Sequence, residues 1–404
     1  MAFSFKLLIF SSQMKIIADS SIPFAADCFS SIGQVQLIPG REMSSADIRD
    51  ADILVVRTIT AVDEHLLAGS KVRFVGTVTI GFDHLDTDFL RRHNIAFASA
   101  PGSNANSVAE YVIAALFNVA KKHNINLQNK SIGIIGVGNC GSRVAKKTEA
   151  LGMKLCLNDP PLYRKTQDPK YLPLENLFDC DFITLHTPLN STGIDKTFHL
   201  ADDKFFNSVK NGCIFLNTSR GPVVETEALK YAIRSGKLAA AVLDVWENEP
   251  NIDVELLEMA DIATPHIAGY SLDGKVTGLI MVYQKICEHF GLEAKFDRGS
   301  FLPAPAVGCL EINPTTASEQ DILRQAVEKI YDINTDDLRN NGILKMPAEK
   351  RPALFDHMRD NYFTCREFQH TQIALKPYSH AVARKLEGIG FTLANTKNNC
   401  GDKK

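Results

Sequence analysis

Short apolar runs alternate with helix-like segments along the first hundred residues. Four runs have the length and composition of β-strands, and the segments between them have the spacing of short helices. This alternation is typical of a parallel sheet covered by helices. We therefore predict an α/β domain with strands at Lys15–Ala18, Ile53–Val56, Arg73–Val78 and Ile95–Ala98, and helices at Pro23–Ser31, Asp63–Ala68 and Asp86–Arg92.

A long helix and a second α/β block follow. The helix is predicted over residues 104–122, where apolar side chains recur on one side. From Lys130 onward, apolar runs again alternate with helical segments, which indicates a second doubly wound parallel sheet. Its strands are expected at the start of the block and at Lys154–Leu157, Phe182–Leu185, Cys213–Asn217, Ala240–Asp244 and Ile262–Thr264, and a helix is expected over Leu272–Phe290.

The segment KSIGIIGVGNCG at Lys130–Gly141 has the pattern of a dinucleotide-binding turn. Gly136 permits a sharp turn out of the strand, and Gly138 lets backbone amides approach a pyrophosphate. Gly141 lets the next helix, which starts near Asn139 and Cys140, pack close to the sheet. Such glycine patterns are common by chance, but this one has a strand before it and a helix after it.

An acidic residue, Asp159, ends the next predicted strand, 18 residues after Gly141. A carboxylate at this offset can accept hydrogen bonds from an adenosine ribose. An acid at this position, rather than an arginine, favours NAD over NADP. We therefore expect NAD as the cofactor.

Three polar segments follow later strands of the same sheet: NTSRGPVVE at Asn217–Glu225, LDVWENEP at Leu243–Pro250 and TPHIAGY at Thr264–Tyr270. Ligands bind at the carboxyl ends of strands in open doubly wound sheets. Removing hydride from a secondary alcohol needs a base, for which His266 is suited, and a carboxylate partner such as Glu249. Arg220 offers a planar guanidinium that can hold a carboxylate.

Each of these three residues also has a plain structural alternative. A lone histidine before a glycine-rich loop is often structural, and most arginines are solvated. Glu249 could belong to a simple acidic loop. The catalytic interpretation depends on all three lying at one edge of one sheet.

These segments resemble the D-isomer-specific 2-hydroxyacid dehydrogenases. The Arg of the R-G segment, the Glu before Pro and the His of P-H-I-A-G are the catalytic set of that family, which implies catalytic roles for Arg220, Glu249 and His266. The glycine turn and NANSVAE at Asn104–Glu110 match as well. The resemblance implies a flavodoxin-like substrate domain and a Rossmann NAD domain, and cofactor contacts at Gly136, Gly138, Asn139, Cys140, Gly141, Asp159, Thr187, Thr218, Asp244 and Gly269.

Other segments are similar to one branch of the family that acts on a phosphorylated 2-hydroxy acid. They include RTIT at Arg57–Thr60, GTVTIGFDH at Gly76–His84 and HIAGYSLDGK at His266–Lys275. This similarity implies substrate contacts at Thr58, Thr79 and Tyr270. Thr58 stands where the branch has a serine, and both threonines could instead cap turns or strand ends. Arg57 and Lys71 are nearby cations that could meet the substrate phosphate.

FLPAP at residues 301–305 is expected to be a rigid linker. In the branch just described, the segment that follows is a C-terminal α+β dimerisation domain, which implies a homodimer. We expect a substrate-binding domain formed by 14–105 together with 272–298, an NAD-binding domain at 106–271, and a dimerisation domain at 299–395. Residues 1–13 and 396–404 are expected to be disordered extensions.

Composition narrows the functional classes. The net charge of −3 and the absence of a long basic run argue against nucleic acid as a partner. No apolar run reaches the ~18 residues of a membrane span, so no membrane partner is expected. The nine cysteines are scattered without a C-x-x-C pair, so no metal site is predicted, and a cytoplasmic location is expected.

Two alternative functions remain open at the level of sequence. A phosphoglycerate- or hydroxypyruvate-type dehydrogenase would share the same catalytic set. A non-catalytic NAD(H)-binding regulator could share the fold, although such a protein has no need to keep Arg220, Glu249 and His266 together.

Overall fold

The computed structural model describes residues 14–394, so the predicted extensions at 1–13 and 396–404 lie outside the described residues. The chain forms two compact units. Within the described residues, the first comprises 14–103 and 275–302, and the second comprises 104–274 and 303–394. Each unit contains its own parallel sheet.

The first unit contains a five-stranded parallel sheet in the order β2-β1-β3-β4-β5. This is the flavodoxin-like strand order, as expected. β3 and β4 are buried along their whole length, which explains why their sequences are continuous apolar runs. The strands are β1 (Met14–Asp19), β2 (Gly33–Ile38), β3 (Ile53–Val56), β4 (Phe74–Thr77) and β5 (Ala96–Ala98).

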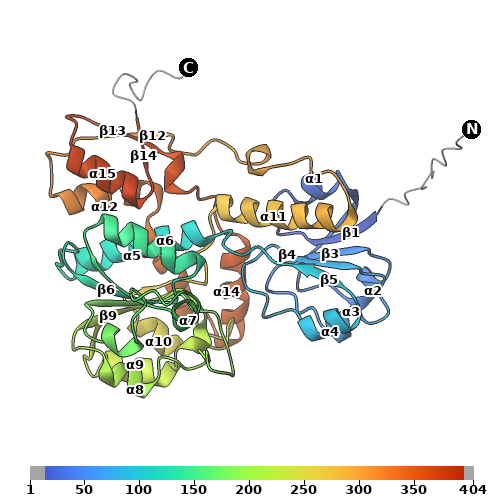
Figure 1. Cartoon of the computed structure of the whole chain (residues 1–404), viewed down its shortest axis with the longest axis horizontal. Coiled ribbons are helices and arrows are strands. Elements are labelled where there is room, and N and C mark those ends of the chain that lie inside the picture. The colour runs from blue at the N-terminus through green and yellow to red at the C-terminus, as the bar shows by residue number, and fades with distance from the viewer. Residues whose placement is uncertain (1–13, 395–404) are drawn as a thin grey trace, which may run out of the picture. The chain divides into compact units, whose positions relative to one another are not determined.

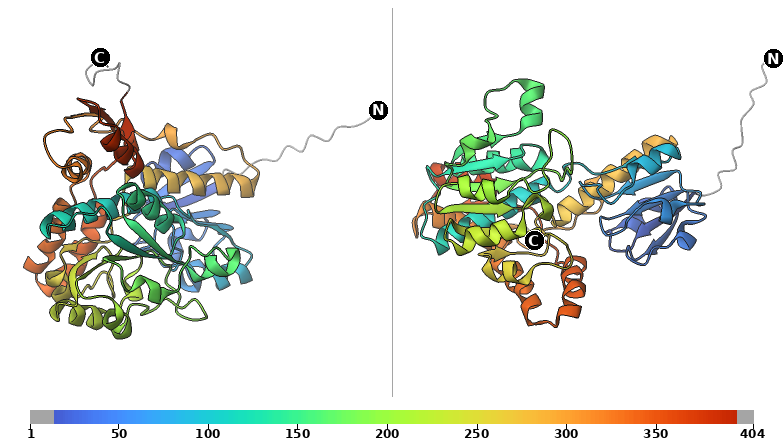
Figure 2. Two further views of the ribbon diagram at one scale, coloured as in Figure 1. Left: turned by 60° about the vertical axis from the view of Figure 1, so that its left-hand side comes forward. Right: turned by 90° about the horizontal axis from the view of Figure 1, so that it is seen from below.

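Helices pack around this sheet. Asp63 and Asp86 cap α3 and α4 by accepting hydrogen bonds from Leu66 N (3.1 Å) and Phe89 N (2.8 Å). The greater part of α11 (Leu272–Phe290) lies beside the strands of this unit (Figure 2). The remaining helices are α1 (Ala25–Phe29), α2 (Ser45–Ile48), α3 (Glu64–Leu67) and α4 (Thr87–Arg92).

The second unit contains a six-stranded parallel sheet in the order β11-β10-β9-β8-β6-β7. The strand order reverses at β6, because β7 lies on one side of it and β8 on the other. A ligand-binding crevice is expected at such a reversal. The strands are β6 (Ser131–Ile135), β7 (Lys154–Asn158), β8 (Phe182–Leu185), β9 (Cys213–Asn217), β10 (Leu238–Leu243) and β11 (Ile262–Ala263).

Helices cover both faces of this sheet, with α5 and α6 on one face and α8, α9 and α10 on the other (Figure 1). The result is the expected doubly wound architecture. The helices are α5 (Ala105–Lys122), α6 (Asn139–Ala150), α7 (Pro160–Thr166), α8 (Asp203–Ser208), α9 (Thr226–Arg234) and α10 (Val254–Met259), with 3₁₀ turns at Leu174–Leu177 and Gly221–Val223.

The C-terminal segment has a small parallel sheet in the order β12-β13-β14, as expected for an α+β part. Its helices α12 and α15 pack against α5 and α6, so this segment belongs to the same compact unit as the NAD-binding region. Its elements are β12 (Cys309–Ile312), α12 (Glu319–Ile330), α13 (Ile333–Asn340), α14 (Arg351–Asp360), β13 (Gln372–Leu375), α15 (His380–Ile389) and β14 (Thr392–Leu393).

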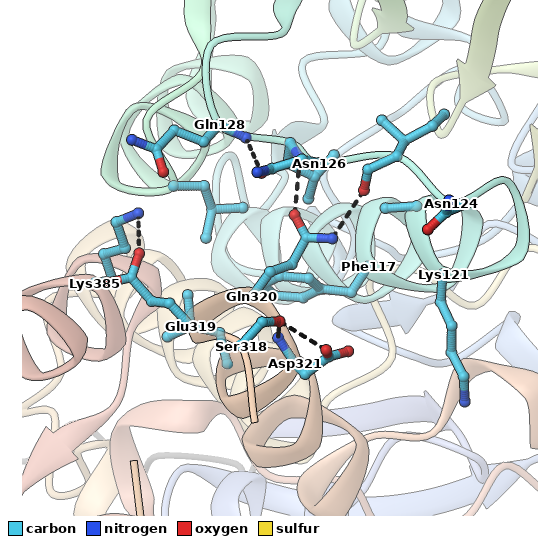
Figure 3. Close-up of a pocket in the computed structure, with 15 residues that line it drawn as sticks. Phe117, Lys121, Asn124, Asn126, Gln128, Ser318, Glu319, Gln320, Asp321 and Lys385 are labelled. Carbon is cyan, nitrogen blue, oxygen red and sulfur yellow. Dashed lines mark hydrogen bonds and ion pairs between the residues drawn. The ribbon is translucent and has the colours of Figure 1, made fainter. Parts of the chain in front are cut away.

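A pocket of about 390 Å³ lies where α12 meets the segment between α5 and β6 (Figure 3). Gln320 holds the two sides together. It donates to the Ile125 carbonyl at 2.9 Å and accepts from Leu127 N at 2.8 Å. None of the predicted site residues lines this pocket. The Gln320 hydrogen bonds join the C-terminal segment to the rest of the unit.

Within residues 14–394, no helix is long and apolar enough to cross a membrane. The same residues contain no group of three or more His, Cys, Asp or Glu side chains placed to hold a metal ion.

Candidate active site

The glycine turn has the geometry that its sequence predicts. Gly136 has φ +87°, and a Cβ there would lie 2.8 Å from the His186 backbone, so glycine is required. A Cβ on Gly141 would lie 1.9 Å from the Gly136 carbonyl, which shows how closely α6 approaches the turn. A Cβ on Gly138, at the N-cap of α6, would have no other atom within 4 Å, so the space beside this residue is open.

The first residues of α6, Asn139 and Cys140, lie at the helix end that favours a phosphate. Burial raises the pKa of the Cys140 thiol to about 11. The thiol therefore stays protonated near neutral pH and is no nucleophile.

Asp159, the residue after β7, connects the glycine turn to the start of α7. Its carboxylate accepts hydrogen bonds from Val137 N at 2.8 Å and from Leu162 N at 2.9 Å. The second bond caps α7. A carboxylate can accept about four hydrogen bonds, so capacity remains for a ribose hydroxyl.

Thr187 lies two residues after the end of β8, and its hydroxyl is buried without a hydrogen-bond partner among the described residues. A buried polar atom of this kind requires an explanation, and a bound ligand is one. The neighbouring His186 ring contacts the hydroxyls of Thr184 (3.0 Å) and Thr218 (3.1 Å). Burial lowers the pKa of His186 to about 3, so this ring is neutral.

The loop that carries Arg220 is held by the side chain of Asn217 at the end of β9. The Asn217 amide oxygen accepts from Ser219 N at 3.0 Å and from the Ser219 hydroxyl at 2.8 Å, while its NH2 group donates to the Arg220 carbonyl at 3.1 Å. The backbone from which the guanidinium extends is thus fixed at the binding edge of the sheet.

Glu249 and His266 form a close pair. The imidazole Nδ1 lies 2.7 Å from Glu249 Oε2, and Oε1 of the same carboxylate accepts from Trp246 N at 2.9 Å. Burial acts to raise the pKa of Glu249, but His266 and Arg359 outweigh it, and the pKa lies below its ordinary value. The ionised carboxylate therefore fixes the ring and directs Nε2 away from Glu249.

Asp244 positions the segment that contains His266. The buried carboxylate accepts from Thr264 Oγ1 (2.6 Å), Ile267 N (2.7 Å) and Ala268 N (3.0 Å), and burial raises its pKa. The Asp244 carbonyl accepts from His266 N at 2.7 Å. The cofactor contact that the family resemblance implies for Asp244 would add to these bonds.

Gly269 lies against α5, because a Cβ there would lie 2.0 Å from the Asn104 side chain. The Asn104 amide oxygen is buried without a partner among the described residues. Tyr270 follows directly, and its ring meets Tyr362 edge-on at 5.8 Å between centroids.

The structure places the predicted site residues in two groups. Thr58 and Thr79 lie in the first unit, after the neighbouring strands β3 and β4. The Thr79 hydroxyl contacts Thr77 Oγ1 at 2.7 Å and donates to the Gly81 carbonyl at 3.1 Å. All the other predicted site residues lie in the second unit, at the carboxyl ends of its strands, in the loops that follow or in the first turn of α6.

The residues present fit NAD. An open cradle at Gly138, an acid at Asp159 and the unpartnered hydroxyl of Thr187 lie along the edge where the strand order reverses. Sequence reasoning missed the supporting residues Asn217, Trp246 and Thr264. Their only sequence signal is that they lie within or beside the motifs, since Asn217 and Thr264 begin two of the polar segments.

Comparisons with known proteins agree with this geometry. Residues 104–268 match the family described as D-isomer specific 2-hydroxyacid dehydrogenase, NAD binding domain, and residues 301–390 match a domain of unknown function. An erythronate-4-phosphate dehydrogenase of Salinibacter ruber is 43% identical over 89% of this chain and 94% of its own length. One from Proteus mirabilis is 40% identical over 94% of this chain and 99% of its own length.

The chain belongs to the erythronate-4-phosphate dehydrogenase family. It is an NAD-dependent dehydrogenase with a 2-hydroxyacid dehydrogenase fold. Solved structures agree with that fold. A 3-phosphoglycerate dehydrogenase of Entamoeba histolytica with bound NAD+ has a TM-score of 0.61 at 26% identity, covering 72% of this chain and 100% of its own. A D-lactate dehydrogenase of Aquifex aeolicus has a TM-score of 0.58 at 24% identity, and the match covers 69% of this chain and 96% of its own.

Proposed function

We propose that this dehydrogenase oxidises 4-phospho-D-erythronate at C2 to 2-oxo-3-hydroxy-4-phosphobutanoate, a step of pyridoxal 5′-phosphate (vitamin B6) biosynthesis. The proposal is carried by the Glu249–His266 pair, 2.7 Å apart, in a chain about as long as its curated relatives of that name. It rests on the roles that the family resemblance implies for Arg220, Glu249 and His266.

The chain's own residues divide the work as follows. The glycine turn and Asp159 would hold NAD, which would supply the acceptor for the hydride from C2. His266 takes the proton of the C2 hydroxyl at Nε2, because Nδ1 is held by Glu249. The Glu249 carboxylate stabilises the imidazolium that forms, and Arg220 holds the C1 carboxylate and the C2 oxygen.

The test is NADH formation, measured as absorbance, with a panel of 2-hydroxy acids. We expect selective activity with 4-phospho-D-erythronate. Comparable or higher activity with 3-phosphoglycerate or glycerate would favour another 2-hydroxyacid dehydrogenase. No activity with any acid, together with tight NADH binding, would favour a regulator.

We further propose that the enzyme is a cytoplasmic homodimer. Each chain would have a substrate domain formed by 14–105 together with 272–298, an NAD domain at 106–271, and a C-terminal domain at 299–395 that forms the dimer interface. Large apolar side chains exposed on the C-terminal segment support this, among them Leu338 (71% exposed) and Tyr378 (46%). Light scattering should give twice the chain mass of 44.6 kDa. A monomer at micromolar concentration would contradict the interface.

A further inference from the structure

The C-terminal segment brings a second guanidinium, that of Arg359, to the catalytic pair. Arg359 lies in α14, whose Phe355 and Met358 are buried in the same apolar core as Trp246 and Ile252. Trp246 and Ile252 flank Glu249 in the sequence. The core contacts therefore fix α14 beside the loop that carries Glu249.

Just beyond α14, the Tyr362 ring packs edge-on against Tyr270, next to the His266 segment. Arg359 thus lies between two anchored points. Burial acts to lower the pKa of its guanidinium, but interactions with Tyr270 and with Glu249 outweigh it, and the pKa is raised. The cation is permanent, and it interacts with Glu249 and Tyr270, to which the family resemblance gives roles in catalysis and substrate binding.

The Nε atom of Arg359 is buried and has no hydrogen-bond partner among the described residues. An unpaired buried donor is costly, and guanidinium Nε normally shares a two-pronged contact with an oxyanion. By contrast, the two cations of the first unit that could meet the phosphate are already in ion pairs. Arg57 Nε lies 2.7 Å from the fully buried Asp19, and Lys71 is 73% exposed and pairs with Asp50.

We propose that Arg359 binds the phosphate of the substrate, so that the C-terminal segment supplies a specificity residue to the active site. This rests on the proposed function, in which Arg220 holds the C1 carboxylate and leaves the terminal phosphate as the remaining anion. Two charge-assisted hydrogen bonds from one planar group would satisfy Nε and distinguish a phosphate from a hydroxyl.

The test uses the full-length enzyme and the variants Arg359→Gln and Arg359→Lys, with Arg384→Gln, at an exposed position of α15, as the matched control. Four quantities are measured: kcat and KM for 4-phospho-D-erythronate, and the competitive inhibition constants of inorganic phosphate and of D-erythronate. We expect Arg359→Gln to raise the substrate KM and the phosphate inhibition constant at least tenfold. The D-erythronate constant should stay within twofold, Arg359→Lys should recover only part of the loss, and Arg384→Gln should behave as wild type.

An unchanged phosphate constant in Arg359→Gln would overturn the proposal. Equal weakening of phosphate and D-erythronate would also overturn it, because it would assign Arg359 to the carboxylate or to the structure of the site. Failure of the proposed function would give a different result, because the wild-type enzyme would then not oxidise 4-phospho-D-erythronate. Inhibition by phosphate could still be compared between wild type and variants, using NADH formation with whichever 2-hydroxy acid the enzyme oxidises.

Discussion

At the scale of single residues, the candidate catalytic pair depends on neighbours that fix both partners. Trp246 N holds one oxygen of Glu249, and the other faces His266 Nδ1. Asp244 accepts hydrogen bonds from the backbone amides of His266 and Ile267. His266 itself has φ +57°, a conformation that these bonds stabilise.

His266→Ala should reduce kcat by about 10²–10⁴, because the base is lost, while the Kd of NAD stays near wild type. The chain offers a matched control in His199, which forms a similar pair with Glu247 at 2.8 Å outside the proposed catalytic set. His199→Ala should keep kcat within about threefold of wild type. Steady-state kinetics and NADH fluorescence titration measure both effects, and near-normal turnover in His266→Ala would refute the assignment of the base.

The lowered pKa of His186, which is partly buried, predicts a loss of stability in acid. Its folded-state pKa of about 3 lies below the ordinary value of 6.5, so between these values the unfolded chain binds more protons. Stability is therefore full at neutral pH and falls as the pH drops, by at most about 1.4 kcal/mol per pH unit from this group. The free energy of unfolding in urea is measured at pH 7 and at pH 5. The difference between these two free energies should be smaller in His186→Gln than in wild type, whereas His380→Gln, at an exposed position, should leave it unchanged. An equal difference in His186→Gln and wild type would count against this account.

At the scale of elements, every strand of the two larger sheets except β2 was predicted from its apolar run. β3, β8 and β9 lie where their apolar runs place them. β2 was missed because it is an edge strand with exposed Gln34 and Leu37, which lacks both a continuous apolar run and a clean alternation. The motifs identified the candidate site residues of the second unit, but Arg359 lies in a helix without any motif, and only the packing of α14 brings it to Glu249.

The two glycines at the start of α6 should respond differently to alanine. Gly141→Ala places a methyl group against the Gly136 carbonyl, so it should lower stability by about 1–3 kcal/mol and weaken NAD binding. Gly138→Ala meets no protein atom within 4 Å, so the protein should keep its stability while NAD binds at least about tenfold more weakly, a loss of about 1.4 kcal/mol. Thermal unfolding and calorimetric NAD titration test both, with Gly342→Ala as a control. Wild-type NAD affinity in Gly138→Ala would contradict the assignment of this turn to the pyrophosphate.

At the scale of the second unit, buried charges join the C-terminal segment to the NAD-binding region. Arg366 donates to Asp273 from Nε at 2.9 Å and from NH2 at 3.0 Å, and Asp273 also accepts from Glu367 N at 3.0 Å. Lys147 donates to the Ile389 carbonyl at 2.6 Å and pairs with Glu110. These contacts hold the C-terminal segment, and α14 with it, against the NAD-binding region.

Asp273→Asn should destabilise the second unit by about 3–5 kcal/mol, because it leaves the Arg366 charge buried and unpaired. Lys376→Gln removes an exposed pair with Glu311 and should change stability by less than about 1 kcal/mol. Urea unfolding gives both values, and limited proteolysis should show earlier cleavage after residue 303 in Asp273→Asn. Equal stability of the two variants would show that this buried pair does not hold the segment in place.

The central claim is that hydride passes from C2 of 4-phospho-D-erythronate to NAD. Incubating the enzyme with substrate deuterated at C2 and analysing the reduced cofactor by mass spectrometry tests this directly. We predict one deuterium in each reduced cofactor, and 2-oxo-3-hydroxy-4-phosphobutanoate as the product. Reduced cofactor without deuterium, or deuterated substrate left unconverted under conditions in which another 2-hydroxy acid is oxidised, would contradict the account.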